Sequence, residues 1–182
     1  MPETKKSTER KEIEMAKKKR NIKNWLKESM FILIPAALVF GTFTVVIKPA
    51  VVSGNSMNDT YQNGDHLLLW RHAEPKKGDV IVCNSKLEKA LVKRVIAEGG
   101  DTVDIDFDTG TVKVNGEVLV EPYIKELTTT DEGGWDYPIT VPDDCYFVMG
   151  DNRNNSRDSR SADVGCIPKK DIQGVAFLKW AM

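Results

Sequence analysis

The sequence contains few of the residues that metal sites and disulfide frameworks require. Only two histidines, His66 and His72, and three cysteines, Cys83, Cys145 and Cys166, occur among 182 residues. No Cys-x-x-Cys or His-x-x-x-His spacing is present, so we expect no metal site. Three widely spaced cysteines are too few for a disulfide scaffold, and whether Cys145 and Cys166 pair stays open because geometry decides it. Any serine–histidine scheme would have to use His66 or His72, and both are expected to be strand or turn residues near the surface.

The chain has almost no net charge, but its charges are unevenly distributed. Residues 1–29 hold ten Lys and Arg against five Glu, which leaves 16 of the 26 basic and 22 of the 27 acidic residues for the rest. An acidic main body argues against nucleic acid as a partner. The basic block can bind anionic lipid or flank a membrane span, and a solvated, partly helical tail is the alternative for residues 1–20.

One long segment, Met30 to Ile47, has no charged residue in eighteen positions. As a helix it would be about 27 Å long, close to the ~30 Å hydrocarbon core of a bilayer. A cleaved secretory signal fits less well, because the charged region before it is long and no small-x-small pair follows it. A buried core helix also fits poorly. We expect a single membrane-spanning helix over residues 30–48, with a basic tail (1–29) in the cytoplasm and residues 49–182 outside the cell membrane.

Beyond residue 49 the pattern changes to short runs rich in Val, Ile and Leu, separated by Gly, Asp, Asn and Pro. No long amphipathic helix and no internal repeat is visible there. The pattern predicts an all-β domain of antiparallel sheets, folded as a barrel or sandwich. Segment 121–138 has little apolar content and is expected to be an exposed connection. The expected strands are 50–54, 66–71, 79–84, 89–97, 102–106, 111–115, 139–141, 144–149 and 173–180, and residues 111–120 are expected to form a tight hairpin around Asn115-Gly116.

Two residues with catalytic chemistry stand in unusual local contexts. Ser56 follows Gly54 at a strand end, where a sharp turn can present its hydroxyl beside backbone N–H groups. Lys93 lies within a strand, and alternation places it and Arg94 on opposite faces without deciding which face is buried. A buried lysine has its pKa lowered from ~10.4 and can act as a general base towards a serine. Taken alone, an ordinary turn and a lysine on the wet face of an edge strand are the simpler explanations.

A dense polar run follows the strand that ends at Met149. Residues 150–160 read Gly-Asp-Asn-Arg-Asn-Asn-Ser-Arg-Asp-Ser-Arg. Asp, Asn and Ser favour turns, so a surface loop is one interpretation. Alternating Asp and Arg residues can also form an ion-pair and hydrogen-bond frame that holds neighbouring catalytic groups in place.

Together these segments resemble type I signal peptidases, also called leader peptidases, of the short Gram-positive type. The matching motifs are Ser56-Met57, Lys93-Arg94 and the 150–160 run, and Gly78 to Val82 matches a further motif of that family. The resemblance covers about residues 30–182, behind the family's membrane anchor. Each motif alone is only weakly specific for the family, but four motifs in the family's order are specific for it.

The resemblance implies a membrane-bound serine endopeptidase that removes N-terminal signal peptides from secreted preproteins after small-x-small sites, by a Ser/Lys dyad. Ser56 would be the nucleophile, with its backbone N–H donating to the oxyanion, Lys93 the general base, and Ser156 the hydroxyl that orients the lysine amine. We expect a monomer without a cofactor, with signal peptides and the lipid bilayer as partners. The residues expected to frame the site are Asp151, Arg153, Asp158 and Arg160, and the candidates for a shallow substrate pocket are Val51, Val52 and Met57.

Two positions depart from the family's pattern. Some members carry a serine two positions before the nucleophile, and its hydroxyl completes the oxyanion hole. Gly54 stands there in this chain, as in the short members, so the second oxyanion donor is unassigned. Asp59 replaces the usual proline of Ser-Met-x-Pro-Thr, which loosens the turn after the nucleophile and adds a charge.

Two other functions would account for parts of the sequence. A self-cleaving repressor of the SOS type also pairs Ser with Lys on a β-fold, but it predicts a DNA-binding helical domain and a scissile Ala-Gly, which the sequence lacks. A membrane-anchored scaffold protein would keep the β-domain. It would not need Ser56, Lys93 and Ser156 together.

Overall fold

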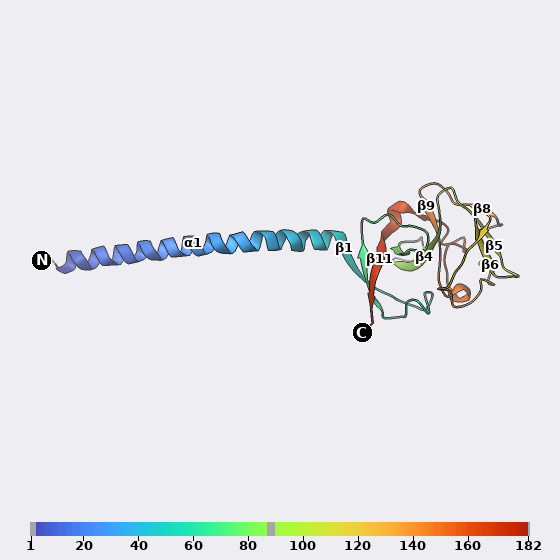
Figure 1. Cartoon of the computed structure of the whole chain (residues 1–182), viewed down its shortest axis with the longest axis horizontal. Helices are drawn as coiled ribbons and strands as arrows, with labels where there is room; N and C mark the ends of the chain where they lie inside the picture. The colour runs from blue at the N-terminus through green and yellow to red at the C-terminus, as the bar shows by residue number, and fades with distance from the viewer. Residues whose placement is uncertain (1–2, 87–89, 182) are drawn as a thin grey trace. The chain divides into compact units, whose positions relative to one another are not determined.

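The computed structural model describes residues 3–86 and 90–181, and its contacts divide the chain into two units between Val45 and Val46. The first unit is helical, and the second holds all the described strands (Figure 1). The elements are α1 (Glu3–Val46), β1 (Ile47–Val51), β2 (His66–Trp70), β3 (Val80–Cys83), β4 (Leu91–Glu98), β5 (Thr102–Asp106), β6 (Thr111–Val114), β7 (Glu117–Val118), β8 (Ile139–Thr140), β9 (Cys145–Met149), β10 (Ile167–Pro168) and β11 (Ile172–Trp180), with short 3-10 helices η1 (Arg153–Asn155) and η2 (Lys169–Asp171).

The uncharged run that begins at Met30 lies in α1, as predicted, up to Val46. Within α1, the stretch Lys17–Val46 is long and apolar enough to cross a membrane by length and composition. The helix is longer than expected, because it continues back through the basic block to Glu3. The predicted helical end at residue 48 was two residues too late, since Ile47 and Lys48 already pair with Trp70 and Leu69 in β1.

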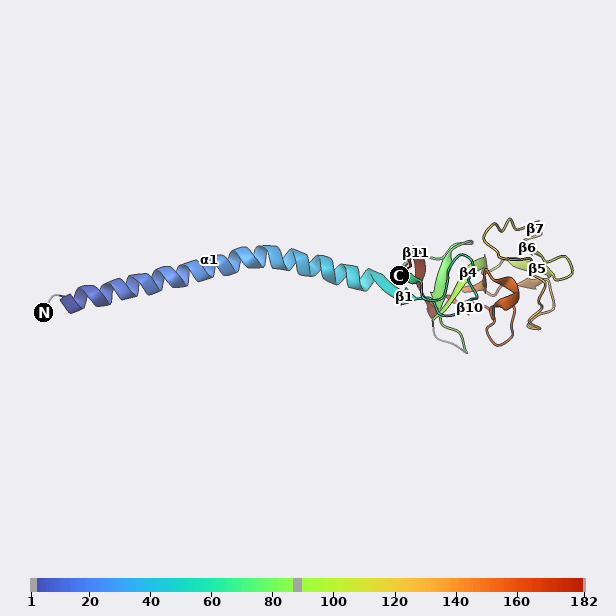
Figure 2. The ribbon, with the colours of Figure 1, turned by 90° about the horizontal axis from the view of Figure 1, so that it is seen from below.

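The strands form two antiparallel sheets. The larger sheet has seven strands in the order β1-β2-β11-β3-β4-β9-β10, and the smaller has four in the order β7-β6-β5-β8. In Figures 1 and 2, β5 and β6 lie together at the end of the domain away from β1 and β11. The predicted class, antiparallel sheets with one N-terminal helix, is confirmed.

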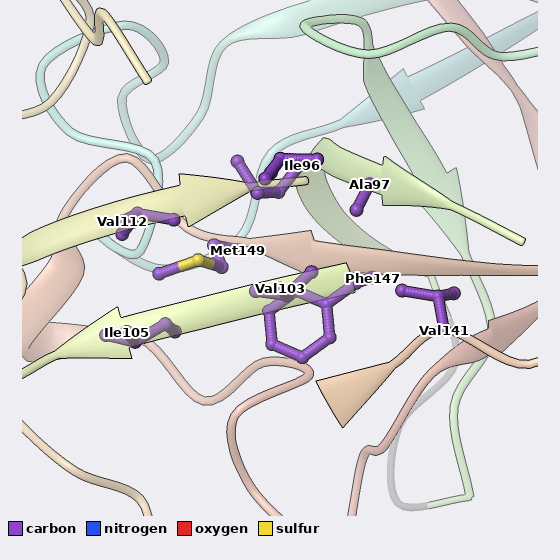
Figure 3. Packing of buried hydrophobic residues seen from close by; sticks show 9 residues of the cluster. Ile96, Ala97, Val103, Ile105, Val112, Val141, Phe147 and Met149 are labelled. Carbon is purple, nitrogen blue, oxygen red and sulfur yellow. The ribbon is translucent and has the colours of Figure 1, made fainter. Parts of the chain in front are cut away.

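Alternation along β3 and β4 buries both faces of the larger sheet. Val80 and Val82 of β3 pack with Val92 of β4 in one apolar cluster, whereas Ile81 and Cys83 pack in another on the opposite side. A third cluster joins the two sheets, and Figure 3 shows its side chains gathered between their strands. Its members are Ile96, Ala97, Val103, Ile105, Val112, Val114, Val141, Phe147 and Met149. The middle of the larger sheet is therefore covered by apolar side chains on both faces, and β4 lies in this part of the sheet.

Most strand predictions were close, and two expectations need correction. The first strand was expected over residues 50–54 but spans Ile47–Val51, because pairing with β2 fixes its register and the chain turns after Val52. Segment 121–138 was expected to be an exposed connection. It is exposed along much of its length, yet the Thr128 side chain is fully buried, because this segment also supplies hydrogen-bond partners to the polar run.

Candidate active site

Ser56 lies on a turn that is hydrogen-bonded on both sides. Gly54 has φ of +91°, which a residue with a Cβ rarely adopts, and its N–H donates to Asn63 Oδ1 at 2.9 Å. The carbonyl oxygen of Ser56 accepts from the backbone N–H of Asn152 at 3.0 Å. The turn after β1 is thus attached directly to the polar run, and the Ser56 side chain is held at the junction.

Lys93 reaches Ser56 from the middle of β4. Its backbone pairs with Ile81 of β3, and its Nζ lies 2.7 Å from Ser56 Oγ. Lys93 is only 2 % exposed, and Arg94 on the opposite face is 9 % exposed. Alternation alone did not decide which face of this strand is buried. In the structure both faces are buried, the one with Lys93 and the one with Arg94. The structure therefore brings together the predicted nucleophile and base, and it keeps the amine away from bulk solvent.

Arg94 forms a buried ion pair with Asp151 behind the site. Its Nε and Nη2 donate to the two carboxylate oxygens at 2.8 and 2.6 Å, the two-pronged geometry that orients both groups. The Arg94 guanidinium also lies 3.9 Å from the centre of the Tyr123 ring. Asp151 adjoins Asn152, which holds the Ser56 carbonyl, so this pair ties β4 to the start of the polar run.

Asp158 is the centre of the polar run. Its carboxylate accepts from Ser156 Oγ at 2.7 Å, from the Gly150 N–H at 2.8 Å and from Arg160 Nε at 2.9 Å. Burial alone would raise the pKa of Asp158, but the hydrogen bonds and charge of Arg160 outweigh it and hold that pKa below its usual range. Ser156 Oγ donates to this carboxylate, which leaves the oxygen lone pairs of Ser156 as acceptors.

Arg153 is fully buried and links the polar run to the 121–138 segment. Its guanidinium donates to both Glu121 oxygens at 2.9 and 2.5 Å, to Thr128 Oγ1 at 2.9 Å and to the Gly150 carbonyl at 3.0 Å. Sequence analysis identified Arg153 but missed Glu121, Thr128 and Tyr123. No local pattern singles out these three, because a carboxylate or hydroxyl in a polar connection looks like a solvated side chain.

Gly150 lies where the serine turn and the polar run come into contact. A Cβ at this position would lie 2.2 Å from Ser156 Oγ and 2.5 Å from the Ser56 carbonyl oxygen, both far inside van der Waals contact. Only glycine therefore allows the serine turn and the polar run to approach each other this closely.

Ser56 and Lys93 open into a cavity of about 620 Å³. Its walls come from the serine turn, from residues 90–93 and from the polar run, including Ser53, Asn155 and Arg157. The predicted pocket residues Val51, Val52 and Met57 are not among the described residues that line it. Val52 and Met57 instead pack into the apolar cluster beneath the serine turn, and Val51 ends β1 with its side chain exposed.

The cysteines and histidines do not offer a competing nucleophile or base. All three cysteines are free, and burial raises the pKa of Cys83 and of Cys166 to about 12, so neither supplies thiolate at neutral pH. His66 stacks on Trp180 with ring centres 5.3 Å apart, and His72 is exposed in a loop. Both histidines lie where the sequence predicted.

Comparison with known proteins agrees with this geometry. The family described as "Signal peptidase, peptidase S26" matches residues 22–181. The chain belongs to this family. It is 40 % identical over 176 residues to signal peptidase I P of Bacillus subtilis subsp. natto, an alignment that covers 89 % of this chain and 90 % of that protein.

More distant signal peptidases also align along most of the chain. A probable signal peptidase I-2 of Synechocystis is 33 % identical over 167 residues, covering 86 % of this chain and 73 % of that protein. A crystal structure of a signal peptidase I from Enterococcus faecalis shares 30 % identity and covers 57 % of this chain and 97 % of that one, with a TM-score of 0.46. The resemblance predicted from the motifs is confirmed, and the chain is a serine-type signal peptidase.

Proposed function

We propose that this peptidase cleaves N-terminal signal peptides from secreted preproteins after small-x-small sites, with Ser56 as nucleophile and Lys93 as general base. The observation that carries the proposal is the 2.7 Å separation of Lys93 Nζ and Ser56 Oγ, combined with the 2 % exposure of the lysine. Burial of an amine among aliphatic side chains disfavours its charged form. A neutral amine at hydrogen-bond distance can accept the serine proton.

The reaction follows as two acyl transfers. Lys93 takes the proton of Ser56 Oγ as that oxygen attacks the scissile carbonyl, and the protonated amine then donates to the leaving amine of the mature protein. The signal peptide remains as an ester on Ser56. Water, deprotonated by Lys93, releases it. In this proposal the backbone N–H of Ser56 donates to the oxyanion, whereas Gly54 has no hydroxyl to contribute.

The polar run serves as the frame of the site. Ser156 donates to Asp158 and can accept an N–H from Lys93, which would orient the amine lone pair towards Ser56. Asp158 and Arg160 form one ion pair of the frame. Asp151 pairs with Arg94, and Arg153 pairs with Glu121. Each charge is matched within the frame, so the frame positions groups without adding net charge.

The helix provides the anchor. We propose that the apolar part of α1, from Met30 to Val46, crosses the lipid bilayer, with the basic tail 1–29 in the cytoplasm and the catalytic domain, residues 47–182, outside. Only nine residues separate Ile47 from Ser56, at most about 30 Å when extended, so the nucleophile stays near the membrane surface, where signal peptides emerge. We propose a monomer as the active form.

Cleavage of a purified preprotein in detergent tests the proposal. We expect processing by the wild type, with the new N-terminus at the predicted site, and no processing by Ser56→Ala or by Lys93→Ala. Circular dichroism should show that both variants keep the β-fold, because neither side chain belongs to an apolar cluster. Processing by folded Lys93→Ala at the wild-type rate would refute the general-base role.

A further inference from the structure

One wall of the catalytic cavity is held in an unfavourable backbone conformation. Ala90 lines the cavity with φ of +65°, a region that residues with a Cβ rarely adopt. Its backbone N–H donates to Asn84 Oδ1 at 3.3 Å. Strained residues at functional sites persist when their surroundings hold them, and the Asn84 side chain is such a restraint.

Asn84 is itself fixed from two directions. Its backbone N–H donates to the Asp171 carbonyl at 2.8 Å, which attaches the end of β3 to η2. Its Oδ1 accepts a second hydrogen bond, from Gln173 Nε2 at 2.7 Å. The side-chain oxygen of Asn84 thus accepts hydrogen bonds from both Ala90 and Gln173, and the Asn84 side chain has little freedom to rotate.

Gln173 reaches Asn84 because β11 bulges at this residue. Ile172 pairs with Cys83 and Gly174 pairs with Val82, so Gln173 is an extra residue in the strand. A Cβ at Gly174 would lie 2.9 Å from the Trp70 carbonyl oxygen, so glycine permits the close approach of β2 at the bulge. Bulges commonly redirect a side chain beside an active site. Here the redirected amide also accepts from Lys48 Nζ, at 2.6 Å, through its Oε1.

We propose that Asn84 and Gln173 are positioning residues that set which side chains the cavity accepts next to the scissile bond. This inference rests on the proposed function. Lys48, two residues after α1, donates to Gln173, and Gln173 donates to Asn84 Oδ1. The same oxygen accepts from the backbone N–H of Ala90, so these hydrogen bonds connect Lys48 to the cavity wall. Without the Asn84 acceptor, Ala90 relaxes towards negative φ, and the wall next to Leu91 shifts.

Ser56 and Lys93 are held in place independently of the hydrogen bonds that join Lys48, Gln173 and Asn84. Lys93 is fixed by pairing with β3, and Ser56 by Asn152. Loss of the Asn84 restraint should therefore weaken substrate binding and size selection, which appear in KM, while the chemical step, which appears in kcat, stays nearly unchanged.

The direction of the hydrogen bonds gives matched variants. Asn84 Oδ1 only accepts in both side-chain bonds, so Asn84→Asp keeps them and Asn84→Leu, of similar size, removes them. Gln173 donates to Asn84 and accepts from Lys48, so Gln173→Glu keeps the second bond and loses the first. Gln62→Leu, which removes an exposed amide elsewhere on the domain, is the control.

The experiment measures kcat and KM on two preproteins that differ only in having Ala or Leu just before the cleavage site. We expect Asn84→Leu and Gln173→Glu to raise KM for the Ala substrate about tenfold and to lower the preference for Ala over Leu about tenfold. Asn84→Asp and Gln62→Leu should behave as the wild type. An unchanged preference in folded Asn84→Leu, or a loss in Asn84→Asp equal to that in Asn84→Leu, would overturn the inference. Failure of the wild type to cleave either preprotein would instead overturn the proposed function.

Discussion

Lys93 lies in a strand and is only 2 % exposed, although it lines the catalytic cavity. Its backbone pairs with Ile81 of β3, and the side chains of Val92 and Arg94 point to the opposite face of β4. The amine therefore lies at the wall of the cavity with almost no surface exposed to bulk water. The chemistry proposed for the site depends on this burial, because an amine that stays charged has no lone pair for the serine proton.

Replacing Lys93 by arginine separates basicity from positive charge. We expect Lys93→Arg to lose processing by at least a factor of about a thousand, because the guanidinium stays protonated at all working pH values. Single-turnover cleavage of a preprotein measures the rate. Lys113→Arg, on the exposed part of β6, is the matched control and should keep full activity. A rate within tenfold of the wild type for Lys93→Arg would contradict the general-base role.

Gly150 permits no side chain. In Gly150→Ala the new methyl would collide with Ser156 Oγ and with the Ser56 carbonyl, so the serine turn must move away from the polar run. We expect activity to fall about a hundredfold or more, with thermal unfolding several degrees lower, because the catalytic hydroxyl shifts relative to Lys93. Gly41→Ala, which has open space around it in α1, should change neither quantity. Wild-type activity in Gly150→Ala would show that the close approach is not needed.

At the scale of elements, the sequence predicted what depends on local pattern. Residues 102–106 were placed correctly because alternation and flanking turns agree there, and the 150–160 run was identified from its composition. The first strand was placed three residues late because its register depends on β2. The role of Val52 and Met57 in substrate binding stays a prediction, and their burial could not be read from the sequence because it depends on an apolar cluster formed with β2, β3 and β4.

The 121–138 segment shows most clearly what sequence alone could not supply. Glu121 and Thr128 bind a buried arginine that follows them by 32 and 25 residues. No periodicity connects such partners, because the pairing depends on how the two sheets come together. The bulge at Gln173 is a similar case, since one extra residue in a strand leaves no trace in the hydrophobic pattern.

Glu121 should stabilise the domain by balancing the charge of Arg153. Glu121→Gln leaves the fully buried guanidinium without its anionic partner, and breaking such a pair costs about 3–5 kcal/mol. We expect a clearly lower midpoint of urea unfolding. Glu117→Gln, on exposed β7, should leave the midpoint within experimental error. Equal midpoints for the two variants would mean that the ion pair contributes nothing to stability.

For the whole domain, buried carboxylates predict sensitivity to acid. The folded-state pKa of Asp158 lies below its usual range, so its ionised form contributes stability above the unfolded-state pKa of ~3.9. That contribution is lost as pH falls through the lower, folded-state value. We expect the free energy of unfolding to be flat near neutral pH and to decrease below about pH 4. Denaturant titrations across this range measure it, and stability that rises on acidification would contradict the assignment.

The contact between Ser56 and the polar run has a consequence for the time at which the enzyme first becomes active. Asn152 holds Asn55 and Ser56 across nearly a hundred residues of intervening chain, and Asp158 and Arg160 complete the frame only a few residues later. With the topology proposed above, Ser56 leaves the membrane before the segment that orients it. The catalytic pair is therefore incomplete until residues 150–160 have followed and docked against the serine turn.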